Sequence, residues 1–114
     1  MIHSIVRIIT KPERHPEALR ILCSLAERTR ALAGCINCYV YRDAQMEHAI
    51  MLDQRWTSLD HLKRHLCSDD YRNVLLSMEM ASEPPEIHFE TISHVSGMEM
   101  IKKIRMGRPV QKTG

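Results

Sequence analysis

The chain has 114 residues, of which 44% are apolar and 26% charged, and it carries a net charge of +2. This length suits one domain with a single hydrophobic core that needs no disulfide or metal to stabilise it. The dispersed basic residues and the single Phe and single Trp exclude an obvious nucleic-acid-binding surface.

The N-terminal segment lacks the apolar stretch and cleavage site of a signal peptide. No apolar run reaches the roughly eighteen residues that cross a bilayer. We therefore expect a cytoplasmic protein that binds no membrane. In that reducing compartment its four cysteines are expected to remain thiols.

Residues 2–10 are β-branched and apolar at both alternating sets of positions, which predicts a strand that is covered on both faces. A helix is expected to begin at Pro16, because proline suits the first helical turn. Its apolar side chains repeat at helical spacing as far as Leu32. Gly34 is expected to cap the C-terminal end of this helix.

Residues 35–43 and 48–56 predict two further strands. The short polar stretch between them predicts an antiparallel hairpin. Thr57 or Ser58 is placed to cap the helix that follows. We therefore expect the chain to turn directly from the second strand of the hairpin into a helix.

That helix carries an apolar stripe from Leu59 to Leu66 and is expected to break at 67–68. A second helical segment follows, and two consecutive prolines at 84–85 end it. Residues 86–93 then alternate apolar and polar side chains, which predicts a fourth strand.

The order β-α-β-β-α-β predicts an α+β fold of the ferredoxin-like type with a four-stranded antiparallel sheet. In this topology strands 2–10 and 48–56 are central, and both helices cover one face. We expect the opposite face to be too apolar for exposure to water, so that a second copy covers it in a homodimer. One domain is expected over residues 1–95.

Residues 96–114 form a basic tail in which a short helix is expected, with Met98, Ile101 and Ile104 on one side. The simpler interpretation is a helix that docks on the domain and a frayed end. The alternative is a site for an anionic partner. The basic side chains of this tail are Lys102, Lys103, Arg105, Arg108 and Lys112.

Residues 52–71, LDQRWTSLDHLKRHLCSDDY, resemble the antibiotic biosynthesis monooxygenase family. In that family the third strand ends in Glu-x-Trp, and a Ser-led helix, a His-Leu pair and a Ser-x-x-aromatic turn follow. Here these positions read Gln54-Arg55-Trp56, Ser58, His65-Leu66 and Ser68-Asp69-Asp70-Tyr71. The resemblance extends over residues 2–93 and implies a dimeric α/β barrel.

The family includes cofactor-free oxygenases, haem degraders and isomerases, so the resemblance does not fix one activity. It implies a cofactor-independent monooxygenase, or a related tautomerase, that acts on a small aromatic, quinol-like or polyketide-like substrate and needs no cofactor. The alternative is a non-catalytic ligand-binding or regulatory dimer. Haem degradation is not expected, because the Asn, Trp and His of the haem-degrading members correspond here to Val6, His65 and approximately Leu75.

His65 is the candidate catalytic residue, because its place on the helix lets the ring reach a cavity between helix and sheet. An imidazole that titrates near neutrality can remove a phenolic or enolic proton, and the resulting anion can pass an electron to dioxygen. The alternative is a histidine that bonds to the backbone and packs the helix. Gln54 stands where the family carries a carboxylate, and an amide cannot act as a general base.

Five further residues are candidate substrate contacts. Trp56 suits either substrate contact or packing in the core or an interface. Asn37 and Tyr41 share one face of the predicted strand 35–43, and with Arg7 they could hydrogen-bond a quinone-like oxygen or pair with other protein groups. Met51 suits an adaptable apolar cavity or a plain core.

His61 and His65 have the spacing of a two-histidine metal clamp, but the sequence indicates no third ligand. Cys35 and Cys38 have the spacing of a redox motif. Residues three apart on a regular strand point to opposite faces, so we expect these cysteines neither to form a disulfide nor to share a metal.

Overall fold

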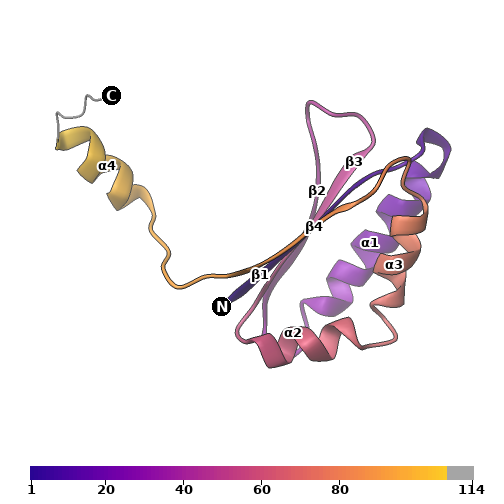
Figure 1. The fold of residues 1–114 in the computed structure, drawn as a ribbon, viewed down its shortest axis with the longest axis horizontal. Coiled ribbons are helices and arrows are strands. Elements are labelled where there is room, and N and C mark those ends of the chain that lie inside the picture. Colours follow the sequence, from indigo (N-terminus) through magenta and orange to yellow (C-terminus); the bar gives the residue numbers. More distant parts are fainter. Residues whose placement is uncertain (108–114) are drawn as a thin grey trace.

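The computed structural model describes residues 1–107 and shows one antiparallel sheet with α1, α2 and α3 on one of its faces (Figure 1). The strand order is β2-β3-β1-β4, so the first and third strands are central. This arrangement confirms the predicted α+β ferredoxin-like fold. The strands are β1 (Ile2–Ile9), β2 (Cys35–Arg42), β3 (Ala49–Trp56) and β4 (Glu86–Thr91).

The first crossover consists of a short 3-10 turn, η1 (Pro12–Arg14), and α1 (His15–Thr29), with Pro16 in the first turn as expected. The apolar side of α1, which includes Leu22 and Leu25, is buried against Val6 and Ile8 of β1. Burial of such side chains is the main source of stability in a domain of this size.

Gly34 does not cap α1, contrary to the sequence prediction. The helix ends at Thr29, and 3-10-type bonds such as Leu32 N–H to the Thr29 carbonyl close its last turn. Gly34 instead has a φ of +84°, a left-handed conformation that glycine adopts at little cost. It turns the chain into β2, and its carbonyl accepts a bond from the Thr57 N–H at 2.8 Å.

The second crossover contains α2 (Leu59–Leu66) and α3 (Arg72–Glu79), separated by the predicted break. Ser58 is the N-cap of α2, and its hydroxyl accepts a hydrogen bond from the His61 N–H. In the break, the Ser68 hydroxyl donates to the His65 carbonyl at 2.6 Å and accepts from the Tyr71 N–H at 3.3 Å. This one hydroxyl satisfies backbone groups on both sides of the turn.

The edge strand β4 pairs only with β1. Its register places Ile87 opposite Val6, on the face that carries the helices. Ile87 and Phe89 remain almost half exposed at this edge. The apolar and polar side chains of β4 therefore alternate between the two faces as predicted. The apolar ones are nevertheless not buried within one chain.

The helix-free face of the sheet is mixed in character, whereas the sequence predicts an apolar one. Along β1, Ile5 and Ile9 alternate with His3 and Arg7 on this face. The charged positions are paired across strands: His3 Nε2 lies 2.8 Å from a carboxylate oxygen of Asp53. The face is less apolar than predicted because the β1 residues that point to it are isoleucines in alternation with titratable residues.

The helix α4 (Met98–Met106) forms in the tail, where the sequence predicts one. Figure 1 shows it apart from the sheet and the other helices, so it does not dock on its own domain. Its apolar residues, including Ile101 and Ile104, are exposed. Arg108 and Lys112, part of the predicted basic tail, lie outside the described residues. No helix within residues 1–107 is long and apolar enough to cross a membrane.

Candidate functional site

Three polar side chains form a connected group between α2 and the sheet. The Trp56 indole Nε1–H donates to the amide oxygen of Gln54 at 3.2 Å. The amide nitrogen of Gln54 lies 3.2 Å from Nε2 of His65. The rings of Trp56 and His65 pack with their centroids 4.9 Å apart. All three residues are buried, with exposed fractions of 1 to 2%.

The local structure explains why these side chains meet. Gln54 and Trp56 are two residues apart on β3, so both point to the face that α2 covers. His65 lies in the last turn of α2 and faces inward, as Leu62 does one turn earlier. The Ser58 cap and the Ser68 turn fix both ends of this helix over the strand.

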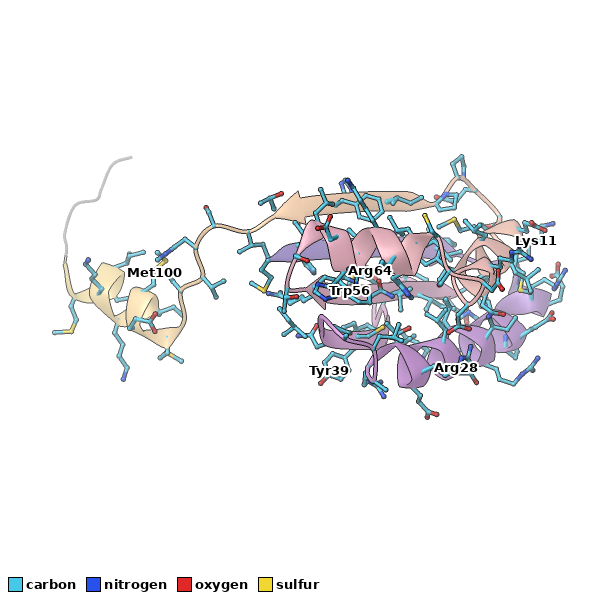
Figure 2. The ribbon with its side chains drawn as sticks, turned by 90° about the horizontal axis from the view of Figure 1, so that it is seen from below. Lys11, Arg28, Tyr39, Trp56, Arg64 and Met100 are labelled. Atoms are coloured by element: carbon cyan, nitrogen blue, oxygen red, sulfur yellow. The ribbon has the colours of Figure 1, made fainter. Side chains whose placement is uncertain are left out.

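A cavity of about 240 Å³ lies beside this group. Figure 2 shows two of its lining residues close together, Arg64 on α2 and Trp56 on β3. Its walls combine apolar and aromatic surface with a few polar groups, as small-molecule sites commonly do. The lining residues are Leu32, Ala33, Trp56, His61, Arg64, His65 and Ser68.

His65 has one nitrogen without a partner. Its Nδ1 atom is buried and makes no hydrogen bond to the protein, which is rare for a buried polar atom. Burial lowers the pKa of the His65 imidazole below its ordinary value of 6.5, and the nearby Asp70 carboxylate partly offsets this effect. The ring is therefore neutral at physiological pH, and its Nδ1 atom is buried without a hydrogen-bond partner.

The phenol ring of Tyr71 packs against the imidazole of His65. Its centroid lies 5.2 Å from that of the imidazole in an edge-on arrangement. Burial raises the pKa of the Tyr71 hydroxyl, so this group is a neutral phenol at physiological pH. Arg28 binds the neighbouring Asp70 through both carboxylate oxygens at 2.8 to 3.1 Å, which holds α3 against α1.

The two histidines of α2 have different partners. His61 Nδ1 lies 2.8 Å from the Ser58 hydroxyl, whereas His65 Nε2 faces Gln54. The ring of His61 lies against Gly34, where any Cβ atom would overlap it. Within the described part of the chain, no three His, Cys, Asp or Glu residues gather where they could hold one metal ion.

The sheet separates the residues predicted to contact substrate. Trp56 and His65 lie on the helix-covered face, whereas Asn37, Tyr41 and Met51 lie on the opposite face. Arg7 also lies on that opposite face, and its guanidinium is paired with the carboxylates of Asp43 and Glu86. The structure therefore brings together only two of the six predicted site residues around the His65 cavity.

Of the other four predicted site residues, three line a second, smaller cavity on the helix-free face. Its volume is about 160 Å³, and it opens beside Arg7, Tyr41 and Met51. A larger and more open hollow of about 730 Å³ lies at the β2–β3 hairpin. There, His15 Nδ1 lies 3.1 Å from the Thr10 hydroxyl. We consider the His65 cavity the better candidate, because it lies beside the buried polar group of Trp56, Gln54 and His65.

Cys35 and Cys38 lie on the same face of β2, contrary to the prediction for a regular strand. A β-bulge between Cys35 and Asn37 shifts the register, so that Cys35 pairs with Trp56 and Cys38 with Gln54. Both cysteines are free thiols. Burial raises the pKa of the Cys38 thiol to about 11, so it is not a reactive thiolate.

Sequence reasoning missed the central place of Gln54, which it treated only as a lost carboxylate. The signal was available, because Gln54 has the same strand parity as Trp56 and so shares its face. The contributions of Leu32 and Arg64 to the cavity depend on how the connection between α1 and β2 meets α2. No local pattern in the sequence indicates that meeting.

Comparison with known proteins assigns the fold to a family. The family model described as "Antibiotic biosynthesis monooxygenase" matches residues 1–75. A crystal structure of an antibiotic biosynthesis monooxygenase superposes with a TM-score of 0.74 at 19% identity, covering 82% of this chain and all of the other. A conserved protein from Methanosarcina mazei Go1 superposes with a TM-score of 0.72 at 26% identity, covering 78% of this chain and 89% of the other. A Mycobacterium tuberculosis protein superposes with a TM-score of 0.76 at 21% identity, covering 84% of this chain and 98% of the other. No curated protein matches the chain.

Proposed function

Because the chain belongs to the antibiotic biosynthesis monooxygenase family, we propose that it is a cofactor-independent monooxygenase, or a related tautomerase. Its substrate is a small aromatic, quinol-like or polyketide-like molecule that occupies the His65 cavity. The observation that carries this proposal is the cavity of about 240 Å³ beside the buried group of Trp56, Gln54 and His65, which is lined by the two rings of Trp56 and His65 and by Arg64.

The reaction balances without a reductant. A substrate with an acidic hydroxyl or methylene group loses a proton and becomes an electron-rich anion. Dioxygen then oxidises the methylene carbon to a carbonyl: one oxygen atom enters the product and the other leaves as water. Four electrons pass from this carbon to dioxygen, so the substrate itself is the electron donor.

The residues around the cavity would bind and orient such an anion. The Trp56 ring offers a flat apolar wall for an aromatic system. Arg64, which lines the same cavity, contributes positive charge. The volume of the cavity favours a ligand of modest size, because about 240 Å³ is at the lower end of small-molecule sites.

The second candidate function is a non-catalytic ligand-binding or regulatory dimer. It is favoured by the low pKa of His65, which makes the imidazole a weak proton acceptor. Both functions predict binding of a small aromatic ligand in the same cavity. They differ in whether the ligand is chemically changed, and the monooxygenase also consumes dioxygen.

Dioxygen uptake by purified, metal-free protein tests this function directly. The substrates would be a panel of quinols and anthrones, with each compound alone as the control for spontaneous oxidation. Uptake that scales with protein concentration and converts an anthrone to one anthraquinone per dioxygen, without release of hydrogen peroxide, supports the oxygenase. Tight binding of the panel without uptake supports the regulatory dimer.

We also propose that the protein is a cytoplasmic homodimer that associates through the helix-free face of the sheet. Ile5, Tyr41 and Met51 contribute apolar surface there. The cross-strand pair of His3 and Asp53 satisfies polar groups that a partner would cover. A face with isolated apolar patches and paired charges suits an interface with a polar rim.

A further inference from the structure

The C-terminal helix α4 lacks the packing that a helix of its length requires. It has nine residues, and an isolated helix of fewer than about 12–15 residues is marginal in water unless an apolar side packs on other structure. Ile101 and Ile104 lie three positions apart on one side of α4, and they are 53% and 67% exposed. Figure 1 shows α4 held away from the sheet and from the other helices. Its apolar side is therefore free to contact another molecule.

A second unpartnered apolar surface lies on the edge strand β4. Ile87 and Phe89 point to the helix-covered face of the sheet, and they are 44% and 49% exposed. We call these two residues the β4 patch. Stacking of two helix-free faces in a dimer leaves the β4 patch uncovered, because the patch is on the opposite face of the sheet.

The two surfaces carry opposite charge. α4 contains three basic residues and one acidic residue, whereas residues 79–90 contain four glutamates and no lysine or arginine. Lys102 and Lys103 take part in none of the ion pairs formed within residues 1–107, and neither do Glu79 and Glu83. Complementary charge of this kind favours encounter and fixes the orientation of an interface.

The connection between β4 and α4 is long enough to reach a second copy. Residues 92–97 span at most about 20 Å when extended, whereas two stacked sheets lie about 10 Å apart. The Ile92 N–H donates to the Met1 carbonyl at 2.8 Å, so the connection first continues along the line of β4. The Gly97 N–H then donates to the Glu99 carboxylate at 2.8 Å, at the start of α4.

On the basis of the homodimer proposed above, we propose that α4 of each protomer packs on the β4 patch of the other protomer. The two isoleucines of α4 cover the patch, and the lysines beside them lie near the glutamates of residues 79–90. The exchange is reciprocal, as a two-fold dimer requires. Both surfaces come after residue 75, where the family match ends, so the contact is an addition to the matched part of the fold.

The exchanged helices strengthen the dimer beyond what the stacked sheets provide. Each protomer is then bound to its partner at the helix-free face and through two helices. Contacts linked within one assembly raise the effective concentration of one another. Dissociation of the dimer therefore requires that α4 leave the β4 patch as well as that the sheets separate.

A photo-cross-linker in place of Ile104 tests the contact in the full-length protein. p-Benzoylphenylalanine keeps this position apolar, and irradiation should give a covalent product of twice the chain mass. Peptide mass spectrometry should place the link in residues 86–91. The same cross-linker in place of Met46, a similarly exposed hairpin residue, should give no link to β4. A link from position 104 within one chain, or none to β4, would overturn the proposal.

The dissociation constant of the dimer provides an independent test. Ile104→Ala and Phe89→Ala should each raise the Kd at least about tenfold, because each removes apolar burial from both copies of the contact. The double variant should raise it little further, since both changes remove the same contact. Met106→Ala, on the other side of α4, should leave the Kd unchanged. Fully additive effects of the two changes would contradict direct packing.

The outcomes separate this inference from the other proposals. A wild-type dimer without the cross-link to β4 would refute the exchange and leave the stacked dimer standing, whereas a monomeric wild type would refute both. Dioxygen uptake bears on neither. The basic and apolar sides of α4 could alternatively bind an anionic membrane surface. Cosedimentation with vesicles of phosphatidylcholine and phosphatidylserine that is lost in Ile104→Ala would favour that surface and contradict the exchange. We expect no cosedimentation.

Discussion

The amide nitrogen of Gln54 faces Nε2 of His65 across 3.2 Å, and neither side chain is more than 2% exposed. This contact joins the third strand to α2 at a place where most domains of this size would bury only apolar groups. A polar group buried so deeply is costly unless it is paired. The pairing satisfies Nε2 of the imidazole, whereas Nδ1 is buried without a partner.

Replacement of His65 by alanine should reduce turnover of a quinol or anthrone by about a hundredfold or more, as removal of a general acid–base group does in other enzymes. The protein should remain a folded dimer with a lower melting temperature. Dioxygen uptake and circular dichroism on the same sample separate the two effects. His94→Ala, at an exposed position after β4 where the imidazole contacts only Ser96, is the matched control. Normal turnover in folded His65→Ala would end the case for this residue.

The stability of the protein should depend on pH through His65. Its pKa is lowered in the folded state by burial, from an ordinary value of 6.5, so the unfolded chain binds the proton more readily. The stabilising contribution is therefore complete above about pH 6.5 and is lost as the pH falls below that value. Urea unfolding at pH 7.5 and pH 5.0 should show a larger loss for wild type than for His65→Asn. Equal losses in the two proteins would contradict the assigned direction.

Gly34→Ala should destabilise the domain by about 1–3 kcal/mol, the usual cost of a strained backbone conformation. The residue has a φ of +84°, and a Cβ atom there would overlap the His61 ring. Gly97→Ala is the control, because its Cβ would approach only the end of the Glu99 side chain. Thermal melts should show a drop for the first variant and almost none for the second. A similar melting temperature for both would indicate that the turn is not constrained.

The helix-free face should carry the dimer contact. Ile5→Asp introduces a charge among the apolar side chains of this face on a central strand, and it should yield monomers in gel filtration with light scattering. Leu75→Asp, on the exposed side of α3, should leave the dimer intact. Circular dichroism confirms that each variant is folded. A monomeric wild type at micromolar concentration would refute the proposed assembly.

Strand parity and helical spacing were sufficient to predict the fold. The order of the elements placed β1 and β3 at the centre of the sheet, and the pair Thr57 and Ser58 marked the start of α2. Both features depend on residues close in sequence, where local preferences and burial agree.

The candidate site was harder to predict because it depends on which face each side chain occupies. The bulge after Cys35 reverses the expected relation between Cys35 and Cys38, and no turn residue in the sequence signals it. Asn37 and Tyr41 were grouped with Trp56 by chemical type, but the sheet lies between them. The direction of the Gln54 amide depends on the three-dimensional pairing with Trp56 and so could not be read from spacing.

A crystal structure with bound 1,8-dihydroxyanthrone tests most directly the claim that the ligand site lies between α2 and the sheet. We predict that the ligand occupies the cavity that Trp56, Arg64 and His65 line. A ligand bound instead on the helix-free face, beside Arg7 and Tyr41, would contradict this account.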